Sequence, residues 1–133
     1  MKDRKFAWMA TLLVGAHGLI GAGHVFAHGK LGIETSWIQN FFIVMVIGLS
    51  PIAAAILLWT SHRRFGALLL VAAMAGSFVF GVYFHYVAIS PDHVSHLPAG
   101  ESQGLFRITA LLLAIMEVLG AGMGWWGYRR RES

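Results

Sequence analysis

Four long apolar stretches, separated by short polar breaks, make up most of this chain. They lie at residues 6–28, 37–59, 65–89 and 105–128. Each is long enough to cross the ~30 Å hydrocarbon core of a bilayer as a helix, whereas an open strand in lipid would leave its backbone groups unpaired. The pattern predicts an all-α integral membrane protein, a single transmembrane domain in residues 1–133 built as a four-transmembrane-helix bundle.

Composition agrees with lipid as the main solvent of this protein. Apolar residues make up 57% of the chain and charged residues only 12%, where a soluble domain carries about a quarter. So few charges cannot cover a globule of this size in water, and we expect the lipid bilayer to be its first partner. Cysteine is absent, so disulfides and thiolate metal ligands are excluded and any site must use nitrogen and oxygen.

The basic residues predict the orientation of the bundle. Only Lys30 and Arg107 lie at the end formed by the connections 29–36 and 90–104. Because cytoplasmic loops are enriched in Lys and Arg, we expect both termini to be cytoplasmic, these two connections to be outer loops, and the protein to reside in the plasma (inner) membrane. A nucleic-acid partner is not expected, since the positive charge is split into short clusters beside the spans. The clusters on the cytoplasmic side are Lys2, Arg4 and Lys5, then Arg63 and Arg64, then Arg129, Arg130 and Arg131.

Histidines inside the predicted spans are the main functional signal. His17, His24 and His28 are spaced by seven and four residues, which puts them on one stripe of the first helix. On the third helix, His85 lies at about the depth of His24, and the outer loop 90–104 contributes further histidines. Five histidines are therefore expected near the outer face, together with two carboxylates, Asp92 and Glu101, that could orient them. The candidate ligands are His24, His28, His85, His93 and His96.

Imidazole groups in this number predict a transition-metal centre, with copper, zinc or iron as the metal ion. Three or four of the histidines would hold one ion and the others would orient or gate it. An open coordination position would make the centre redox-active or hydrolytic, whereas a saturated one would serve metal handling or structure. The sequence alone does not decide whether the protein is an enzyme.

A second signal lies near the middle of the predicted bundle. Glu117 on the fourth helix and His17 on the first are at about the same depth, and a charged carboxylate facing lipid would be costly. We therefore expect a buried His17–Glu117 pair, acting as a structural clamp or as a proton relay. Gly120 and Gly124 follow Glu117 in GxxxG spacing and predict close packing against a small-residue face such as the Ala10 side of the first helix.

The sequence is also compatible with three other functions. In one, His24 and His85 ligate a haem b axially, and the chain resembles four-helix cytochromes b in general layout. In another, the histidines are structural and the bundle is an accessory subunit of a homo-oligomer or larger membrane complex. In the third, the column formed by Glu117, His17, His24 and His28 conducts protons or ions.

The first apolar stretch also allows a different interpretation. Val25-Phe26-Ala27 is acceptable before a signal-peptidase cut, which would leave His28 as the mature N-terminus. That start resembles histidine-brace copper monooxygenases in its first residue pair, where the amine and the ring would chelate copper. The segment is, however, as long as the other spans, and its retention completes an even number of helices. We therefore expect it to stay as the first transmembrane helix.

Overall fold

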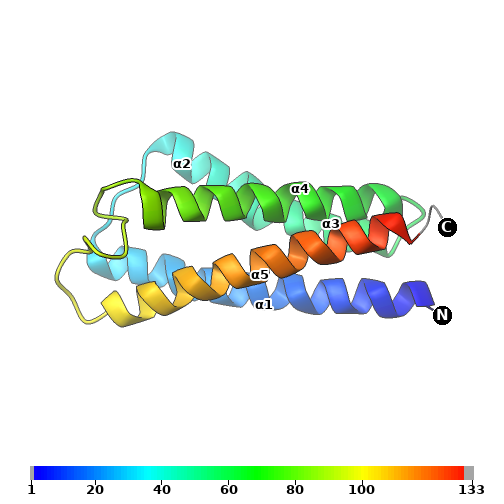
Figure 1. Cartoon of the computed structure of the whole chain (residues 1–133), viewed down its shortest axis with the longest axis horizontal. Coiled ribbons are helices and arrows are strands. Elements are labelled where there is room, and N and C mark those ends of the chain that lie inside the picture. The colour runs from blue at the N-terminus through cyan, green and yellow to red at the C-terminus, as the bar shows by residue number, and fades with distance from the viewer. Residues whose placement is uncertain (1, 131–133) are drawn as a thin grey trace.

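The computed structural model describes residues 2–130, with side chains from residue 4 onward, and it is all-helical (Figure 1). Within these residues, four helical spans are long and apolar enough to cross a membrane, which confirms the four predicted helices. The elements are α1 (Lys2–Leu31), α2 (Trp37–Phe42), the π-helical segment η1 (Ile43–Leu49), α3 (Ser50–Leu58), α4 (Arg63–Val82), the π-helical segment η2 (Tyr83–Val87) and α5 (Gln103–Arg129). The second span runs through α2, η1 and α3, and the third through α4 and η2.

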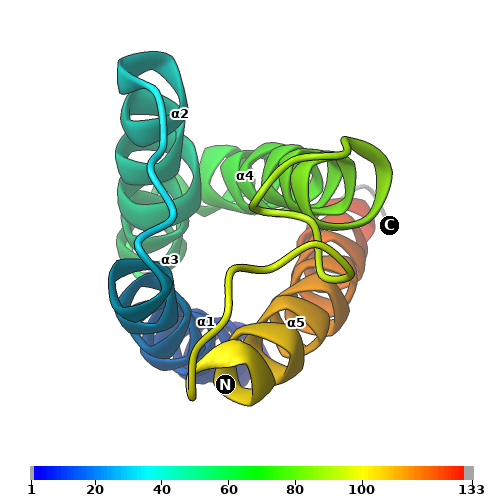
Figure 2. The same ribbon diagram turned by 90° about the vertical axis from the view of Figure 1, so that its left-hand side faces the viewer.

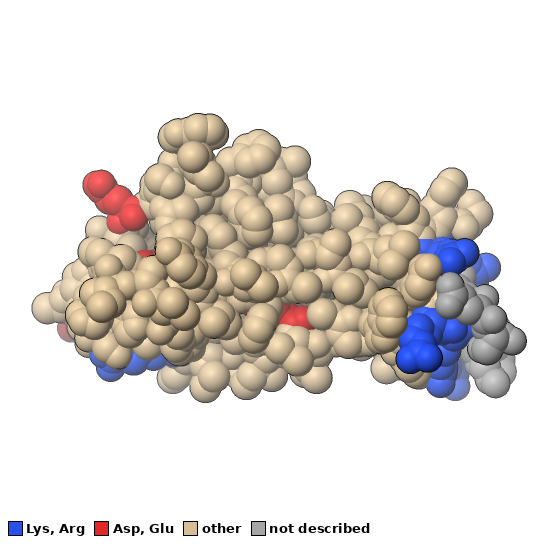
Figure 3. All heavy atoms as spheres, turned by 45° about the horizontal axis from the view of Figure 1, so that its top comes forward, with Lys and Arg blue, Asp and Glu red and all other residues tan. Residues whose placement is uncertain are grey.

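The spans run up and down, so α1 begins and α5 ends at the same end of the bundle (Figure 1). Lys and Arg side chains gather at that end (Figure 3). The opposite end carries the two loops that join α1 to α2 and η2 to α5. The side chains of Lys2 and Arg131, which the charge pattern included, lie outside the described residues.

Glycines on α5 set its close packing against α4. A Cβ added at Gly124 would lie 2.9 Å from the Ala67 carbonyl oxygen of α4, and one at Gly120 would lie 2.7 Å from Cγ of Met74. Gly120 also approaches α1, at Leu13. The close packing predicted from the GxxxG spacing is therefore present, with α4 supplying the nearest atoms at both glycines. Packing of the pair against the Ala10 side of the first helix stays a prediction.

The second span changes direction around Pro51. Proline has no N–H to continue an α-helical ladder, and the chain widens into η1 just before it. The Ser50 N–H and hydroxyl both donate to the Met45 carbonyl, the hydroxyl at 2.7 Å, so this carbonyl stays satisfied. The following α3 buries Pro51, Ala54, Ala55 and Leu58, whereas α2 and η1 bury no residue. The half of this span formed by α2 and η1 therefore leans out of the bundle (Figure 2), and we call it the leaning half.

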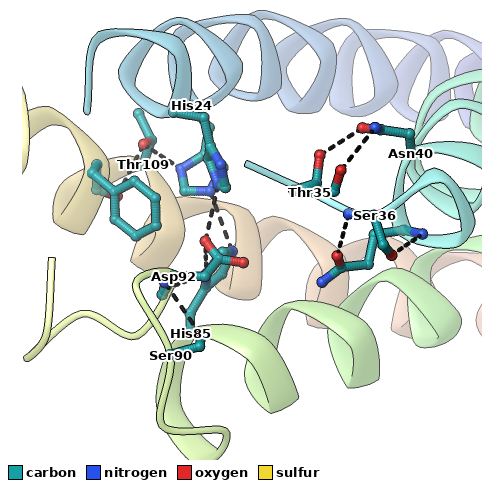
Figure 4. Close-up of polar contacts among 11 residues, drawn as sticks. His24, Thr35, Ser36, Asn40, His85, Ser90, Asp92 and Thr109 are labelled. Carbon is teal, nitrogen blue, oxygen red and sulfur yellow. Dashed lines mark hydrogen bonds and ion pairs between the residues drawn. The ribbon is translucent and has the colours of Figure 1, made fainter. Parts of the chain in front are cut away.

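The start of the leaning half is defined by its own sequence. Ser36 caps α2 by accepting from the Gln39 N–H at 3.2 Å, and the Gln39 side chain accepts from the Ser36 N–H at 2.7 Å (Figure 4). Such a reciprocal capping box fixes where a helix begins.

Between the leaning half and the other spans lies a cavity of about 770 Å³. Apolar residues dominate its lining, and its ionisable lining residues are His17, His24, His28, His85, Asp92 and Glu117.

Candidate metal centre

Three histidines meet at the end of the bundle opposite the basic residues. His24 and His28 lie one turn apart on α1, and His85 lies on η2. Each offers one ring nitrogen, and these three atoms all lie within 4.8 Å of one another. His24 and His85 are buried, while His28 is partly exposed. These are three of the five histidines that the sequence placed near this end, and we call them the histidine cluster.

The hydrogen bonds of His24 assign its protonation (Figure 4). Its Nδ1 lies 2.8 Å from the Thr109 hydroxyl oxygen. That hydroxyl also lies 2.7 Å from the Leu105 carbonyl oxygen and 3.1 Å from the Phe106 carbonyl oxygen, and when its one proton goes to a carbonyl it accepts from the ring. In that arrangement Nδ1 of His24 carries the hydrogen and its Nε2 presents a lone pair.

The same reasoning applies to His85. Its Nδ1 lies 3.1 Å from the backbone carbonyl oxygen of Asp92, which can only accept (Figure 4). The hydrogen is therefore on Nδ1, and the Nε2 of His85 also presents a lone pair. Histidines that bind metals through one ring nitrogen typically donate from the other ring nitrogen to a carbonyl in this way.

The two free nitrogens face each other. Nε2 of His24 and Nε2 of His85 are 3.2 Å apart. Nitrogens at that distance are held together either by a shared hydrogen or by a shared metal ion, since two bare lone pairs would repel. With each nitrogen about 2.0–2.1 Å from a shared ion, this separation corresponds to an angle of about 100° at the ion, close to tetrahedral.

Asp92 brings a buried carboxylate to the same place. Its Oδ1 lies 3.1 Å from Nε2 of His28 and 3.3 Å from Nδ1 of His85. Burial alone raises the pKa of this carboxyl, but the contacts with His28 and His85 outweigh it and hold the pKa well below its usual range. Oδ1 nevertheless has no well-angled hydrogen bond among the described residues, so it is a negative oxygen available to a cation.

Phe106 closes the site on the α5 side. It is fully buried, and its ring centroid lies 4.6 Å from that of His24, 5.0 Å from that of His28 and 5.2 Å from that of His85. An apolar wall here keeps water away from the rings and strengthens their electrostatic interactions. Phe106 and Thr109 are the residues that the sequence analysis missed. The sequence signal that could have found them is an aromatic residue and a hydroxyl residue three positions apart in the fourth apolar stretch, at the depth of the histidines.

The other predicted ligands lie elsewhere in the loop between η2 and α5. His93 and His96 form a separate pair with their Nδ1 atoms 3.2 Å apart, and the His93 Nδ1 also accepts from the Ser95 N–H. A hydrogen bond from His96 to His93 accounts for this pair without an ion. Glu101 is exposed and is not part of the histidine cluster. The loop is held by Arg107, whose Nε donates to the Val94 carbonyl at 3.0 Å.

The structure also brings His17 and Glu117 together. Nε2 of His17 lies 3.4 Å from Oε1 of Glu117, and both side chains are buried. This pair joins α1 to α5 deeper in the bundle than the histidine cluster, and both residues line the cavity.

Comparison with known proteins adds no family to this geometry: no protein-family model, curated protein or solved structure matches the chain. Three imidazoles and one carboxylate at the histidine cluster are suited to copper, zinc or iron.

Proposed function

We propose that this chain is an integral membrane protein that binds one transition-metal ion, copper, zinc or iron, through His24, His28 and His85. The observation that carries the proposal is the 3.2 Å separation of the Nε2 atoms of His24 and His85, with each ring held by a hydrogen bond on its far side. A cation bound between them would be attracted by both nitrogens.

Asp92 has two parts to play in such a site. Its backbone carbonyl orients His85, and its Oδ1 lies close enough to His28 to orient that ring as well. With three imidazoles as ligands and Asp92 only orienting them, a fourth position stays open, as in catalytic metal sites. A bound ion would supply Lewis-acid or one-electron chemistry there, while Phe106 limits the access of water.

The spacing favours a single ion held by neighbouring rings over the alternative of a haem. Two axial nitrogens on opposite faces of a haem iron, each about 2.0 Å from it, would be about 4 Å apart with the macrocycle between them. His24 and His85 are closer than that, and Phe106 packs against both rings. This supports a mononuclear, non-haem centre.

We also propose the orientation that the charge pattern predicts. The end where α1 begins and α5 ends, rich in Lys and Arg, would face the cytoplasm, and the histidine cluster would lie near the outer face of the plasma (inner) membrane. The metal centre would then be reached from outside the cytoplasm or from the outer leaflet.

The test is the metal content of protein purified without a histidine tag. We expect about one ion of copper, zinc or iron per chain, lost in both His24→Ala and His85→Ala. His93→Ala is the matched control, because His93 is outside the histidine cluster, and it should keep the ion. Equal metal content in all three variants, absence of metal after reconstitution, or a haem absorption band would contradict the proposal.

A further inference from the structure

The cavity beside the histidine cluster has two polar ends and apolar walls. At one end lie the histidine cluster and Asp92, and at the other the buried His17–Glu117 pair. Its volume of about 770 Å³ falls in the range of small-molecule sites. The walls between the two ends come from all four spans and are mostly apolar, with Ile47, Phe80 and Leu113 among them.

At its glycine positions, the side of α1 that lines the cavity faces open space and does not pack against another helix. A Cβ added at Gly15, Gly18 or Gly21 would meet nothing within 4 Å, and all three glycines line the cavity. By contrast, Gly120 and Gly124 on α5 sit directly against side chains or backbone of α4. The α1 glycines therefore leave space in the cavity, whereas the α5 glycines allow α4 and α5 to pack closely.

The two polar ends are close to each other. A Cβ added at Gly81 would lie 3.9 Å from Oε2 of Glu117 and 3.9 Å from Cδ2 of His85. These two atoms can therefore be no further apart than twice that distance. The two polar ends are therefore close enough for one small molecule to contact both.

The cavity opens toward lipid between α1 and the leaning half of the second span. Val25 of α1 and Val44 of η1 line the cavity, and both are more than half exposed, at 61% and 55%. Neither α2 nor η1 buries a residue. A molecule dissolved in the bilayer can reach the cavity at this depth without crossing water.

We infer that this cavity binds a lipid-soluble molecule of the quinone class, with one ring oxygen at the histidine cluster and the other at the His17–Glu117 pair. The inference deepens the proposed function, because it gives the metal centre a partner of stated chemistry. Both ends offer groups that bond to oxygen: imidazole nitrogens at the histidine cluster accept from the hydroxyl of the reduced quinol form, and the His17–Glu117 pair offers both a donor and an acceptor. A single-headed lipid such as a fatty acid would leave one end without a partner.

The experiment measures decylubiquinone retained by the full chain in nanodiscs, extracted and quantified per chain against empty nanodiscs. Gly21→Leu should lower retention about tenfold or more, because its side chain would fill the space between the two polar ends. Gly122→Leu is the matched control. Gly122 lies on α5, has nothing within 4 Å of an added Cβ and does not line the cavity, so this variant should bind like the wild type.

Two further measurements keep the inference falsifiable. Gly18→Leu tests the same wall from another position, and Glu117→Gln should weaken retention about tenfold by altering the inner polar end. Equal retention in wild type and Gly21→Leu, or equally strong displacement of the quinone by dodecanoic acid, would overturn the inference. Metal content measured on the same samples separates the proposals: metal without quinone contradicts only this inference, and quinone without metal contradicts only the metal centre.

Discussion

Thr109 is the residue that determines which nitrogen of His24 is free. When its hydroxyl donates to the Leu105 carbonyl, it accepts from His24 and leaves Nε2 available. Without this acceptor, the ring could adopt the other tautomer and turn a hydrogen toward His85. One hydroxyl outside the histidine cluster therefore decides whether the cluster can bind a cation.

Thr109→Val removes that acceptor and keeps the shape of the side chain. We expect it to lower metal affinity about 10–100-fold, because a metal-binding histidine generally loses that much when the partner that orients its ring is removed. Competition with a chelator of known affinity measures the change. Thr11→Val is the control, since Thr11 bonds the Ala7 carbonyl and Trp59 away from the site. A Thr109→Val protein within twofold of wild type would show that His24 does not depend on this contact.

The His17–Glu117 contact makes a separate prediction at this scale. Both side chains are buried and their polar atoms lie 3.4 Å apart, so removing either leaves the other without its partner. A double-mutant cycle with His17→Ala and Glu117→Gln, measured by unfolding in mixed micelles, should give a coupling of about 0.5–1.5 kcal/mol. Additive effects of the two substitutions would mean that the pair does not clamp α1 to α5.

At the scale of elements, hydropathy predicted the four spans because the length of an apolar run is set directly by bilayer thickness. The two π-helical segments were not predictable in the same way. Pro51 interrupts the α-helical ladder of the second span, but the widening of η1 and the outward lean of α2 depend on what the neighbouring spans leave uncovered. GxxxG spacing likewise predicts that a helix approaches closely and not which one, and here α4 supplies the nearest atoms at Gly120 and Gly124.

Packing between α4 and α5 gives a prediction with an internal control. Gly124→Ala would place Cβ 2.9 Å from the Ala67 carbonyl oxygen and 3.0 Å from the Val71 backbone nitrogen, and neither can move alone. We expect a loss of about 1–3 kcal/mol in the free energy of unfolding. Gly122→Ala, which meets nothing within 4 Å, should be neutral or stabilising by up to about 1 kcal/mol. Equal stability of the two variants would contradict this packing.

At the scale of the molecule, the sequence predicted part of the candidate site by depth. The spacing of His24 and His28 and the level of His85 were readable from helix geometry, and the structure places these three together. The positions of the side chains in the loop 90–104 could not be predicted from helix geometry. Asp92 turns inward while His93 and His96 pair with each other, because the path of a loop follows from backbone contacts such as that of Val94 with His85.

The orientation of the whole bundle is testable because the chain has no cysteine. Ser95→Cys lies in the loop beside the histidine cluster, and Ser61→Cys lies between α3 and α4 at the basic end. A membrane-impermeant maleimide should label Ser95→Cys in intact cells and Ser61→Cys only after permeabilisation. The reverse pattern would place the histidine cluster on the cytoplasmic side.

Whether His24 and His85 share one metal ion is best measured by an anomalous-difference map at the absorption edge of the bound metal. We expect one peak about 2.0–2.1 Å from the Nε2 atoms of both rings, with His28 as a further ligand. A peak at His93 and His96, or no peak near the histidine cluster in protein reconstituted with metal, would contradict this expectation.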